Sequence, residues 1–336
     1  MRTALIVGGT GQIGLAAARR LADDGWDVTL AARTDADVGF RVSVFDRSEA
    51  GALESAVGQG VDLLLDVVPY TLADAEQVVA LRGRVGSVIA ISSAAVYADA
   101  EGLTFDSQEQ GLFPRFPVPI SERQRTCVPG EETYSQRKRA IELALLEHDD
   151  LRATIVRPGA IHGPYTRFSR EWFFVKRIVD GRRFVVLARR GESRFHTTAT
   201  ENLAELIRLA ARRPRRRVLN CGDPDAPTAV GIGRACAAAL GYEFAEVLLP
   251  GPEQGSLGDH PWNVATPFVM DMSEAALDLG YRPVATYENA VADTCRWLVE
   301  HTRGRDWREA LPEALAHMEP FFDYAAEDAF LQALAT

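Results

Sequence analysis

The stretch that decides the fold of this chain is Leu5-Ile6-Val7-Gly8-Gly9-Thr10-Gly11-Gln12-Ile13-Gly14. A short apolar run at residues 4–7 leads directly into the glycines, and helix-forming residues follow at 15–22. This order predicts a strand, a tight turn and a helix. The glycines at 9, 11 and 14 have the spacing of a dinucleotide-binding turn, and those at 8, 11 and 14 fit a variant with a longer first gap.

Each glycine of such a turn has a separate task. One allows the tight turn, another lets the backbone approach a pyrophosphate, and Gly14 lets the helix pack closely on the strand. The start of the helix offers unpaired N–H groups and the positive end of its dipole to phosphates. A glycine-rich turn that binds nothing is the alternative. The cofactor-binding residues predicted here are Gly8, Thr10, Gly11, Gln12, Ile13 and Gly14.

Length and composition narrow the class of protein. A chain of 336 residues can form two lobes that share a cleft. A formal net charge of -10 and a pI near 5.2 argue against general affinity for nucleic acids or membrane surfaces. The four cysteines are far apart and lack metal-ligand spacing, as in reduced cytosolic proteins. The apolar stretch after Met1 is shorter than that expected of a signal segment, and the sequence contains no 18-residue apolar run. We therefore expect a soluble cytoplasmic protein with a small-molecule substrate, no metal site, and neither nucleic acid nor membrane as a partner.

Strand and helix patterns alternate along the chain. The strands are expected at 27–32, 41–45, 61–68, 87–91, 153–157 and 218–220, and the helices at 49–57, 72–81, 131–146, 200–211, 231–240, 273–279, 288–301 and, as a tail, 307–334. This alternation predicts an α/β fold with a doubly wound parallel (Rossmann) sheet. We expect residues 1–164, joined by 195–222, to form the NAD(P)-binding domain. A smaller C-terminal substrate-binding lobe would comprise 165–194 and 223–336, with the tail packed on its own lobe or, as an unsupported alternative, forming a homodimer contact.

Ligands of such sheets lie beyond the carboxyl ends of the strands. Gly8, Arg33, Asp46, Val68 and Ser93 all follow strand ends. We therefore assign the first four to the cofactor site.

Arg33 bears on the choice of cofactor. A basic residue at this place accommodates a 2′-phosphate, whereas an acidic one binds the ribose hydroxyl, so NADP is favoured over NAD. The alternative is an exposed loop arginine, with Asp35 or Asp37 at the ribose. Asp46 is expected to accept from the adenine amino group, or else to cap a helix that starts near Ser48.

Tyr134 and Lys138 supply the predicted chemistry. They are four residues apart and therefore share one helical face. A tyrosine with a pKa of about 10 is a poor base at pH 7, but a neighbouring ammonium and an oxidised nicotinamide lower that pKa by roughly 1–3 units. The phenol then exchanges protons with a substrate carbonyl or hydroxyl, which Ser93 would orient. The predicted catalytic residues are Ser93, Tyr134 and Lys138.

Three further segments have unusual composition. Between residues 167 and 194, nine basic and three acidic residues are interleaved with aromatic ones, which indicates either an anionic ligand or an ion-paired surface. The arginine-rich run at 212–217 is expected to be a solvated turn after a helix. Residues 99–133 are irregular and carry several prolines, and loops of this length are usually mobile or functional.

These motifs together resemble the extended short-chain dehydrogenases/reductases of the epimerase/dehydratase superfamily. The resemblance covers most of the chain. It implies that Tyr134 is the acid/base, that Lys138 also holds the nicotinamide ribose, and that Ser93 is the active-site hydroxyl residue. The matching pieces are Gly8-Gly-Thr-Gly11-Gln-Ile-Gly14, Ser92-Ser93-Ala-Ala-Val96-Tyr97, Tyr134-Ser-Gln-Arg-Lys138, Arg157-Pro158 and Gly163-Pro164. The resemblance also adds Pro158 to the predicted cofactor site.

The chain departs from the family pattern in three places. Sugar-nucleotide dehydratases carry an Asp-Glu pair where this chain has Ala94 and Ala95, so the resemblance does not extend to dehydration. Many sugar-nucleotide epimerases bind the diphosphate with an asparagine where Ala160 stands. Ser93 and Tyr134 are 41 residues apart, wider than the family pattern, so the 99–133 loop is expected to add a distinctive pocket wall.

The main hypothesis is an NADP(H)-dependent oxidoreductase that acts at a ketone or secondary alcohol of a small biosynthetic metabolite, with an anionic metabolite as one option. An epimerase of a sugar or sugar nucleotide with retained NAD(P), and a non-catalytic cofactor-sensing protein, remain as alternatives. Arg177 and Arg194 are candidates for binding a nucleotide sugar. His162, Tyr165, Trp172 and Phe174 would either line the substrate pocket or serve ordinary packing.

Overall fold

The computed structural model describes residues 1–335, and its main sheet has seven parallel strands in the order β10-β6-β5-β4-β1-β2-β3. The strands are β1 (Arg2–Val7), β2 (Trp26–Ala32), β3 (Arg41–Val44), β4 (Leu63–Asp66), β5 (Val88–Ile91), β6 (Ala153–Pro158) and β10 (Arg217–Cys221). Strands β4, β5 and β6 are buried along their whole length, as expected of parallel strands covered on both faces. The predicted α/β fold with a doubly wound parallel sheet is therefore confirmed.

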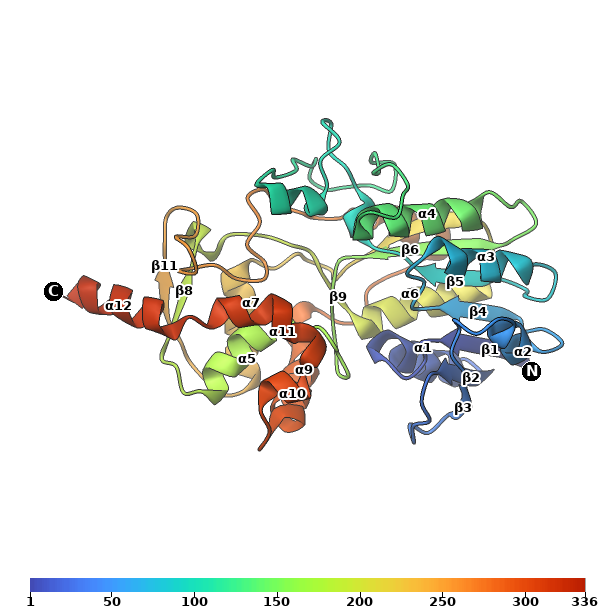
Figure 1. Cartoon of the computed structure of the whole chain (residues 1–336), viewed down its shortest axis with the longest axis horizontal. Helices are drawn as coiled ribbons and strands as arrows, with labels where there is room; N and C mark the ends of the chain where they lie inside the picture. The colour runs from blue at the N-terminus through green and yellow to red at the C-terminus, as the bar shows by residue number, and fades with distance from the viewer. Residues whose placement is uncertain (336) are drawn as a thin grey trace. The chain divides into compact units, whose positions relative to one another are not determined.

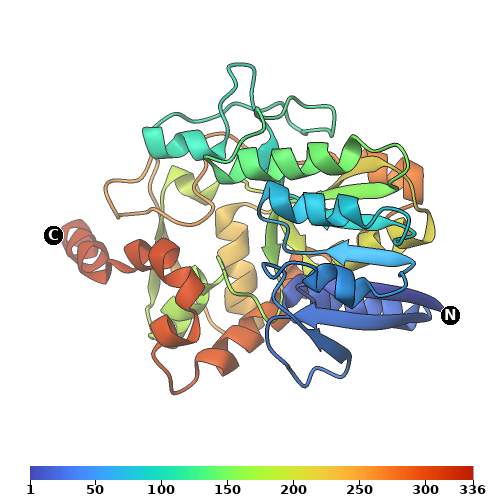
Figure 2. The ribbon, with the colours of Figure 1, turned by 45° about the vertical axis from the view of Figure 1, so that its right-hand side comes forward.

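Helices cover both faces of this sheet (Figures 1 and 2). On one face α1 (Gln12–Asp23) packs against α6 (Thr200–Arg212). On the other, α3 (Leu72–Ala80) packs against α4 (Tyr134–Leu146), and the buried residues of α2 (Ala52–Val57) join the same apolar core. The glycine turn, at the carboxyl end of the central strand β1, therefore belongs to a sheet with a helical layer on each face.

The chain divides into two compact units whose boundaries differ from the predicted ones. Unit 1 comprises 1–159, 200–222 and 270–284, and unit 2 comprises 160–199, 223–269 and 285–336. Residues 160–164 and 195–199 were expected in the first domain but lie in unit 2, because β7 (Ala160–His162) pairs with β9 (Thr197–Ala199) there. Residues 270–284 were expected in the second lobe but belong to unit 1. A hydrogen bond from the backbone N–H of Asp271 to Ile120 O ties this segment to unit 1. This segment contains α8 (Ser273–Leu279).

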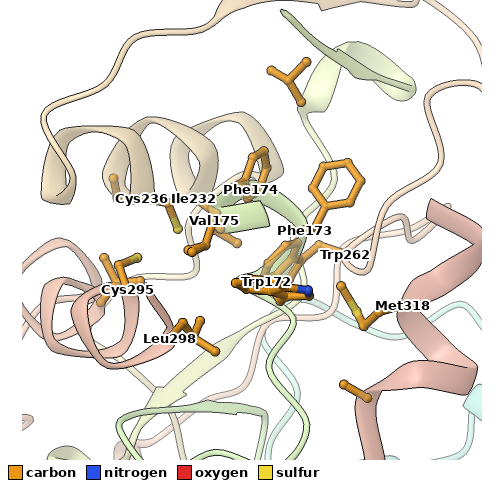
Figure 3. Packing of buried hydrophobic residues seen from close by; sticks show 14 of the residues in the cluster. Trp172, Phe173, Phe174, Val175, Ile232, Cys236, Trp262, Cys295, Leu298 and Met318 are labelled. Carbon is orange, nitrogen blue, oxygen red and sulfur yellow. The ribbon is translucent and has the colours of Figure 1, made fainter. Parts of the chain in front are cut away.

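Unit 2 has an aromatic core of its own (Figure 3). Helices α5 (Trp172–Val179), α7 (Ala229–Ala239) and α9 (Tyr287–Thr302) contribute most of it and contact one another. A second pair of strands, β8 (Phe184–Leu187) and β11 (Ala245–Leu248), runs parallel in the same unit. The sequence patterns did not predict α5, β8 or β11.

The C-terminal tail is helical but not continuous, which corrects the single helical stretch predicted for 307–334. It consists of α10 (Trp307–Ala310), α11 (Pro312–Met318), a 3₁₀ turn (Glu319–Phe322) and α12 (Tyr324–Ala335). Pro312 stands at the first position of α11 and a second proline in the 3₁₀ turn, and a proline cannot continue a preceding helix. The tail packs on its own unit, since Glu327 pairs with buried Arg177 at 2.6 Å.

The described range is residues 1–335. No helix in this range is long and apolar enough to cross a bilayer. The same residues include no group of three or more His, Cys, Asp or Glu side chains that could hold a metal ion.

Candidate active site

The glycine turn joins β1 to α1 with little free space. Gly8 has a φ of 78°, a left-handed conformation that favours glycine. A Cβ on Gly9 would lie 2.7 Å from the Leu30 side chain, and one on Gly14 would lie 2.5 Å from Gly9 Cα. The turn therefore uses both predicted glycine spacings, with Gly8 for conformation and Gly9 and Gly14 for close packing.

Gly11 is the residue of the turn that faces open space. A Cβ there would meet only Gly8 O, at 3.6 Å. Gly11 is also the N-cap of α1, where no side chain caps the helix. The first N–H groups of α1 are thus available to an anion, as at known dinucleotide sites. The buried Oε1 of Gln12 has no hydrogen-bond partner among the described residues, so this acceptor could take a hydrogen bond from a hydroxyl of a bound molecule but not from its phosphates.

The other residues of the predicted turn have simpler positions. Thr10 is half-buried in the turn, whereas Ile13 is buried in the core, so only its backbone N–H faces the start of the helix. Val68 lies against the turn, because a Cβ on Gly8 would be 2.9 Å from Val68 Cγ1. Pro158 is buried at the end of β6, in register with Cys221 of β10. The residues of the glycine turn fit a pyrophosphate-bearing cofactor.

Arg33 and Asp46 follow adjacent strand ends and influence each other. Arg33 is exposed. Asp46 accepts hydrogen bonds from the backbone N–H and the Oγ of Ser48, at 2.9 and 2.8 Å, and these bonds, with the charge of Arg33, hold the pKa of the Asp46 carboxyl below its usual range. Asp46 closes a turn and does not cap a helix, because α2 begins only at Ala52 with Gly51 as its N-cap. The prediction of a helix beginning near residue 48 is thereby corrected.

Two of the three catalytic candidates, Tyr134 and Lys138, lie close together in the first turns of α4. Lys138 Nζ lies 5.8 Å from the centre of the Tyr134 ring. It donates to Pro69 O at 2.8 Å and to Ile91 O at 3.0 Å, and Ile91 ends β5 two residues before Ser93. Ser93 is half-buried, and its Oγ accepts from the backbone N–H of Ala95 at 3.1 Å. The buried lysine thus ties the catalytic helix to the ends of two strands.

Lys138 is an unusual residue in this chain. The sequence contains only two lysines, Lys138 and Lys176, against 35 arginines. The Lys138 side chain is 3% exposed, and burial lowers the pKa of its ammonium to about 8 although nearby carboxylates raise it. A lysine can lose its proton in this range and an arginine cannot. The rarity of lysine was a signal in the sequence that pattern analysis missed.

An arginine that the sequence analysis missed neutralises two carboxylates near Lys138. Arg47 donates to both carboxylate oxygens of Asp66 at 3.0 Å and pairs with Asp74 at 2.9 Å. Asp66 ends β4 and is buried, and burial raises the pKa of its carboxyl despite Arg47. Because this pairing joins the loop after β3 to the start of α3, sequence spacing alone could not reveal it.

A second network of buried polar side chains surrounds Glu142 of α4. Glu142 of α4 accepts from Arg157 Nε and NH2 at 2.8 and 2.6 Å, and from Ser92 Oγ at 2.7 Å. Burial alone would raise the pKa of the Glu142 carboxyl, but these partners and Arg139 lower it. Ser92 is therefore committed to the interior, while its neighbour Ser93 stays half-buried.

The 99–133 loop is ordered by buried polar contacts. Asp99 is 1% exposed and accepts from the backbone N–H of Leu103 and of Arg115, both at 2.9 Å. Asp106 Oδ2 accepts from the N–H of Ser135 at 3.2 Å, next to Tyr134. The loop therefore contacts the start of α4, and its role as a pocket wall stays a prediction.

The two basic segments are extensively paired with carboxylates. In unit 2, Lys176, Arg177, Arg182, Arg189 and Arg167 pair with Asp180, Glu327, Asp328, Glu253 and Glu313 respectively. In unit 1, Arg212, Arg215, Arg216 and Arg217 pair with Asp24, Asp278, Asp149 and Asp278. Of the two interpretations of the basic segment at 167–194, an anionic ligand or ion pairing, the ion pairs agree with the second. Arg177 is 1% exposed, so the idea that it binds a nucleotide sugar is wrong, whereas Arg194 is exposed and donates to Ala226 O at 2.9 Å.

Three of the four candidate pocket residues of unit 2 are buried. Trp172 and Phe174 are buried in the aromatic core (Figure 3). His162 is buried and its Nε2 lies 2.9 Å from Asp223 Oδ2. Tyr165 is 42% exposed with a φ of 64°.

Comparisons with known proteins agree with the fold of the chain. The model of the NAD dependent epimerase/dehydratase family matches residues 4–222. Among solved structures of similar fold, UDP-galactose 4-epimerase has a TM-score of 0.67 at 18% identity, covering 89% of this chain and 99% of that one. The dTDP-glucose 4,6-dehydratase of Bacillus anthracis str. Ames, in complex with NAD, has a TM-score of 0.68 at 13% identity, covering 90% and 98%.

The chain belongs to the NAD-dependent epimerase/dehydratase family, the extended short-chain dehydrogenases/reductases. The predicted resemblance is thereby confirmed, and binding of NAD(P) is typical of the family. A curated relative is the chloroplast stem-loop binding protein of 41 kDa b of Arabidopsis thaliana, 24% identical over 279 residues, which are 76% of this chain and 67% of that protein.

Proposed function

We propose that this protein is an NADP(H)-dependent oxidoreductase that acts at a ketone or secondary alcohol of a small metabolite. The observation that carries the proposal is the buried Lys138 ammonium beneath the half-exposed Tyr134 ring, tied to the strand end that leads to Ser93. Tyr134 transfers a proton to or from the substrate oxygen, and Ser93 orients that oxygen. The bound nicotinamide supplies or accepts the hydride.

The proposed preference for NADP rests on Arg33. Its side chain is exposed at the end of β2, and the neighbouring carboxylate of Asp46 is already engaged by Ser48. An exposed guanidinium suits a 2′-phosphate. Titration of the protein with NADPH and with NADH, followed by nicotinamide fluorescence, tests this. We expect tighter binding of NADPH, and loss of that preference in Arg33→Ser; equal affinities in the native protein would contradict it.

The reaction is tested with Tyr134→Phe. The native protein should oxidise NADPH in the presence of a reducible small carbonyl compound, and the variant should bind NADPH normally but turn over at least 10²-fold more slowly. Turnover that survives in the variant would refute the role of Tyr134. Interconversion of a sugar or sugar nucleotide without net consumption of nicotinamide would instead support an epimerase with retained cofactor.

We propose a small molecule, not a nucleic acid, as the partner, although one relative is named for stem-loop binding. The arginine-rich run at 212–217 is the most basic segment of unit 1, and four of its arginines pair with carboxylates. Paired arginines release few counterions from a phosphate backbone. A gel-shift titration with a stem-loop RNA should show no complex at micromolar protein; a salt-sensitive complex would overturn this assignment.

A further inference from the structure

Two tyrosine rings, not one, flank the Lys138 ammonium. Nζ lies 5.8 Å from the centre of the Tyr134 ring and 5.2 Å from that of Tyr70, which follows β4. The lysine side chain is 3% exposed, whereas the tyrosines are 41% and 57% exposed. The rings therefore form the outer layer of the site, and the ammonium lies in the inner one.

We propose that Tyr70 is a positioning residue of the site: together with Tyr134, its ring covers the Lys138 ammonium and keeps water away from it. The inference deepens the proposed function and rests on it for the role of Lys138 in proton transfer. Over a titration the ammonium gives its proton to bulk water, and no other bond forms or breaks. A ring face also attracts the cationic form, so the shielding by the rings must outweigh this attraction.

The backbone around Tyr70 is fixed on both sides. Pro69 O accepts from the Lys138 ammonium at 2.8 Å, and the N–H of Tyr70 donates to Asp74 Oδ2 at 2.8 Å. Thr71 and Asp74 form the capping box of α3. The start of this helix therefore holds the Tyr70 ring over the lysine.

The charged groups near Lys138 are balanced by arginines. Asp66 at the end of β4 and Asp74 of α3 pair with Arg47, and Glu142 of α4 pairs with Arg157. The ammonium itself donates to the two backbone carbonyls of Pro69 and Ile91. With the carboxylates paired elsewhere, access of water to the ammonium is the main determinant of its pKa, which burial lowers to about 8.

The two lysines of the chain permit a direct test. Protein carrying ¹³C at the lysine ε carbon gives two lysine signals, and Lys176, paired with Asp180 in unit 2, is the internal reference. In the native protein the Lys138 signal should titrate with a midpoint near 8. Tyr70→Phe keeps the ring, so the midpoint of the Lys138 titration should stay within about 0.3 pH units of the native value. Tyr70→Ala opens the ammonium to water, so its midpoint should rise by at least one unit toward about 10.4.

An unchanged midpoint in Tyr70→Ala would overturn the inference, and so would an equal shift in Tyr70→Phe. Should the alanine variant lose its near-UV circular dichroism, Tyr70→Ser gives the same test with a residue suited to the turn before α3. The titration needs no substrate, so failure of the proposed reaction and failure of this inference are distinguishable. A shifted midpoint with normal NADPH binding but no turnover would refute only the reaction.

Discussion

Replacement of Glu142 by glutamine should destabilise unit 1 far more than the same change in an exposed ion pair. Glu142 is fully buried and Arg157 is 2% exposed, so the variant leaves a buried guanidinium without a countercharge. Breaking such a pair costs about 3–5 kcal/mol. That range corresponds to a loss of roughly 10²–10³·⁵-fold in the folding equilibrium constant, and urea unfolding monitored by far-UV circular dichroism measures it directly.

The chain contains a matched control. Glu246 accepts two hydrogen bonds from Arg234 at 2.7 and 2.6 Å, nearly the geometry of the Glu142 pair, but the Arg234 side chain is 65% exposed. Exposed pairs contribute about 0–1 kcal/mol, so Glu246→Gln should be nearly neutral. Equal losses in Glu142→Gln and Glu246→Gln would refute the argument that burial, rather than geometry, sets the magnitude.

The same variant has a defined pH dependence. The pKa of Glu142 is lowered in the folded protein, so its contribution to stability is present above the unfolded pKa of about 4.3 and is lost as the pH falls through the folded pKa. The difference in unfolding free energy between native protein and Glu142→Gln should therefore shrink on acidification. A gap that is constant from pH 7 to pH 3 would contradict the ion pair as its source.

Further predictions concern the glycine turn and a buried histidine. Gly14→Ala should lower the free energy of unfolding in urea by about 1–3 kcal/mol, because its Cβ would lie 2.5 Å from Gly9 Cα. In Gly11→Ala the Cβ would lie 3.6 Å from Gly8 O, so this variant should remain stable but lose NADPH affinity in a fluorescence titration. The reverse order of stabilities would contradict this assignment. Burial lowers the pKa of His260 to about 3, so its unfolded form takes up a proton below about pH 6.5 that the folded form rejects, and stability falls with acidification. Because neither ring nitrogen has a partner among the described residues, His260→Leu should gain about 2 kcal/mol relative to the native protein on going from pH 8 to pH 5; a pH-independent difference would contradict this.

The sheet and its cofactor turn could be predicted because they depend on local patterns. Residues 5–14 specify strand, turn and helix through apolar runs and glycines, and Gly8 and Gly14 have the strained or crowded positions that such a turn requires. Tyr134 and Lys138 were found because a helix places residues four apart on one face. Each of these inferences needs only neighbours in the sequence.

The supporting networks could not be predicted because they join distant segments. Asp66 reads as part of an apolar strand, and nothing in its neighbourhood identifies Arg47 as its partner. Tyr70 follows the proline that ends the same strand pattern, and only the fold places it over Lys138. Likewise α5 was obscured, because arginines and lysine interleave with its aromatic residues, although Arg177 is buried against Glu327 of the tail.

The way in which the units share the chain affects how the protein is made. Unit 1 includes residues 200–222 and 270–284, so its last strand, β10, is synthesised only after β7, α5, β8 and β9 of unit 2. Until β10 has been made, β6 is the edge strand of the sheet, although it is buried along its whole length in the folded protein. Long-range strand pairing of this kind slows folding and exposes an edge that invites aggregation. Expression at lower temperature, which slows aggregation, should therefore raise the soluble yield of this protein.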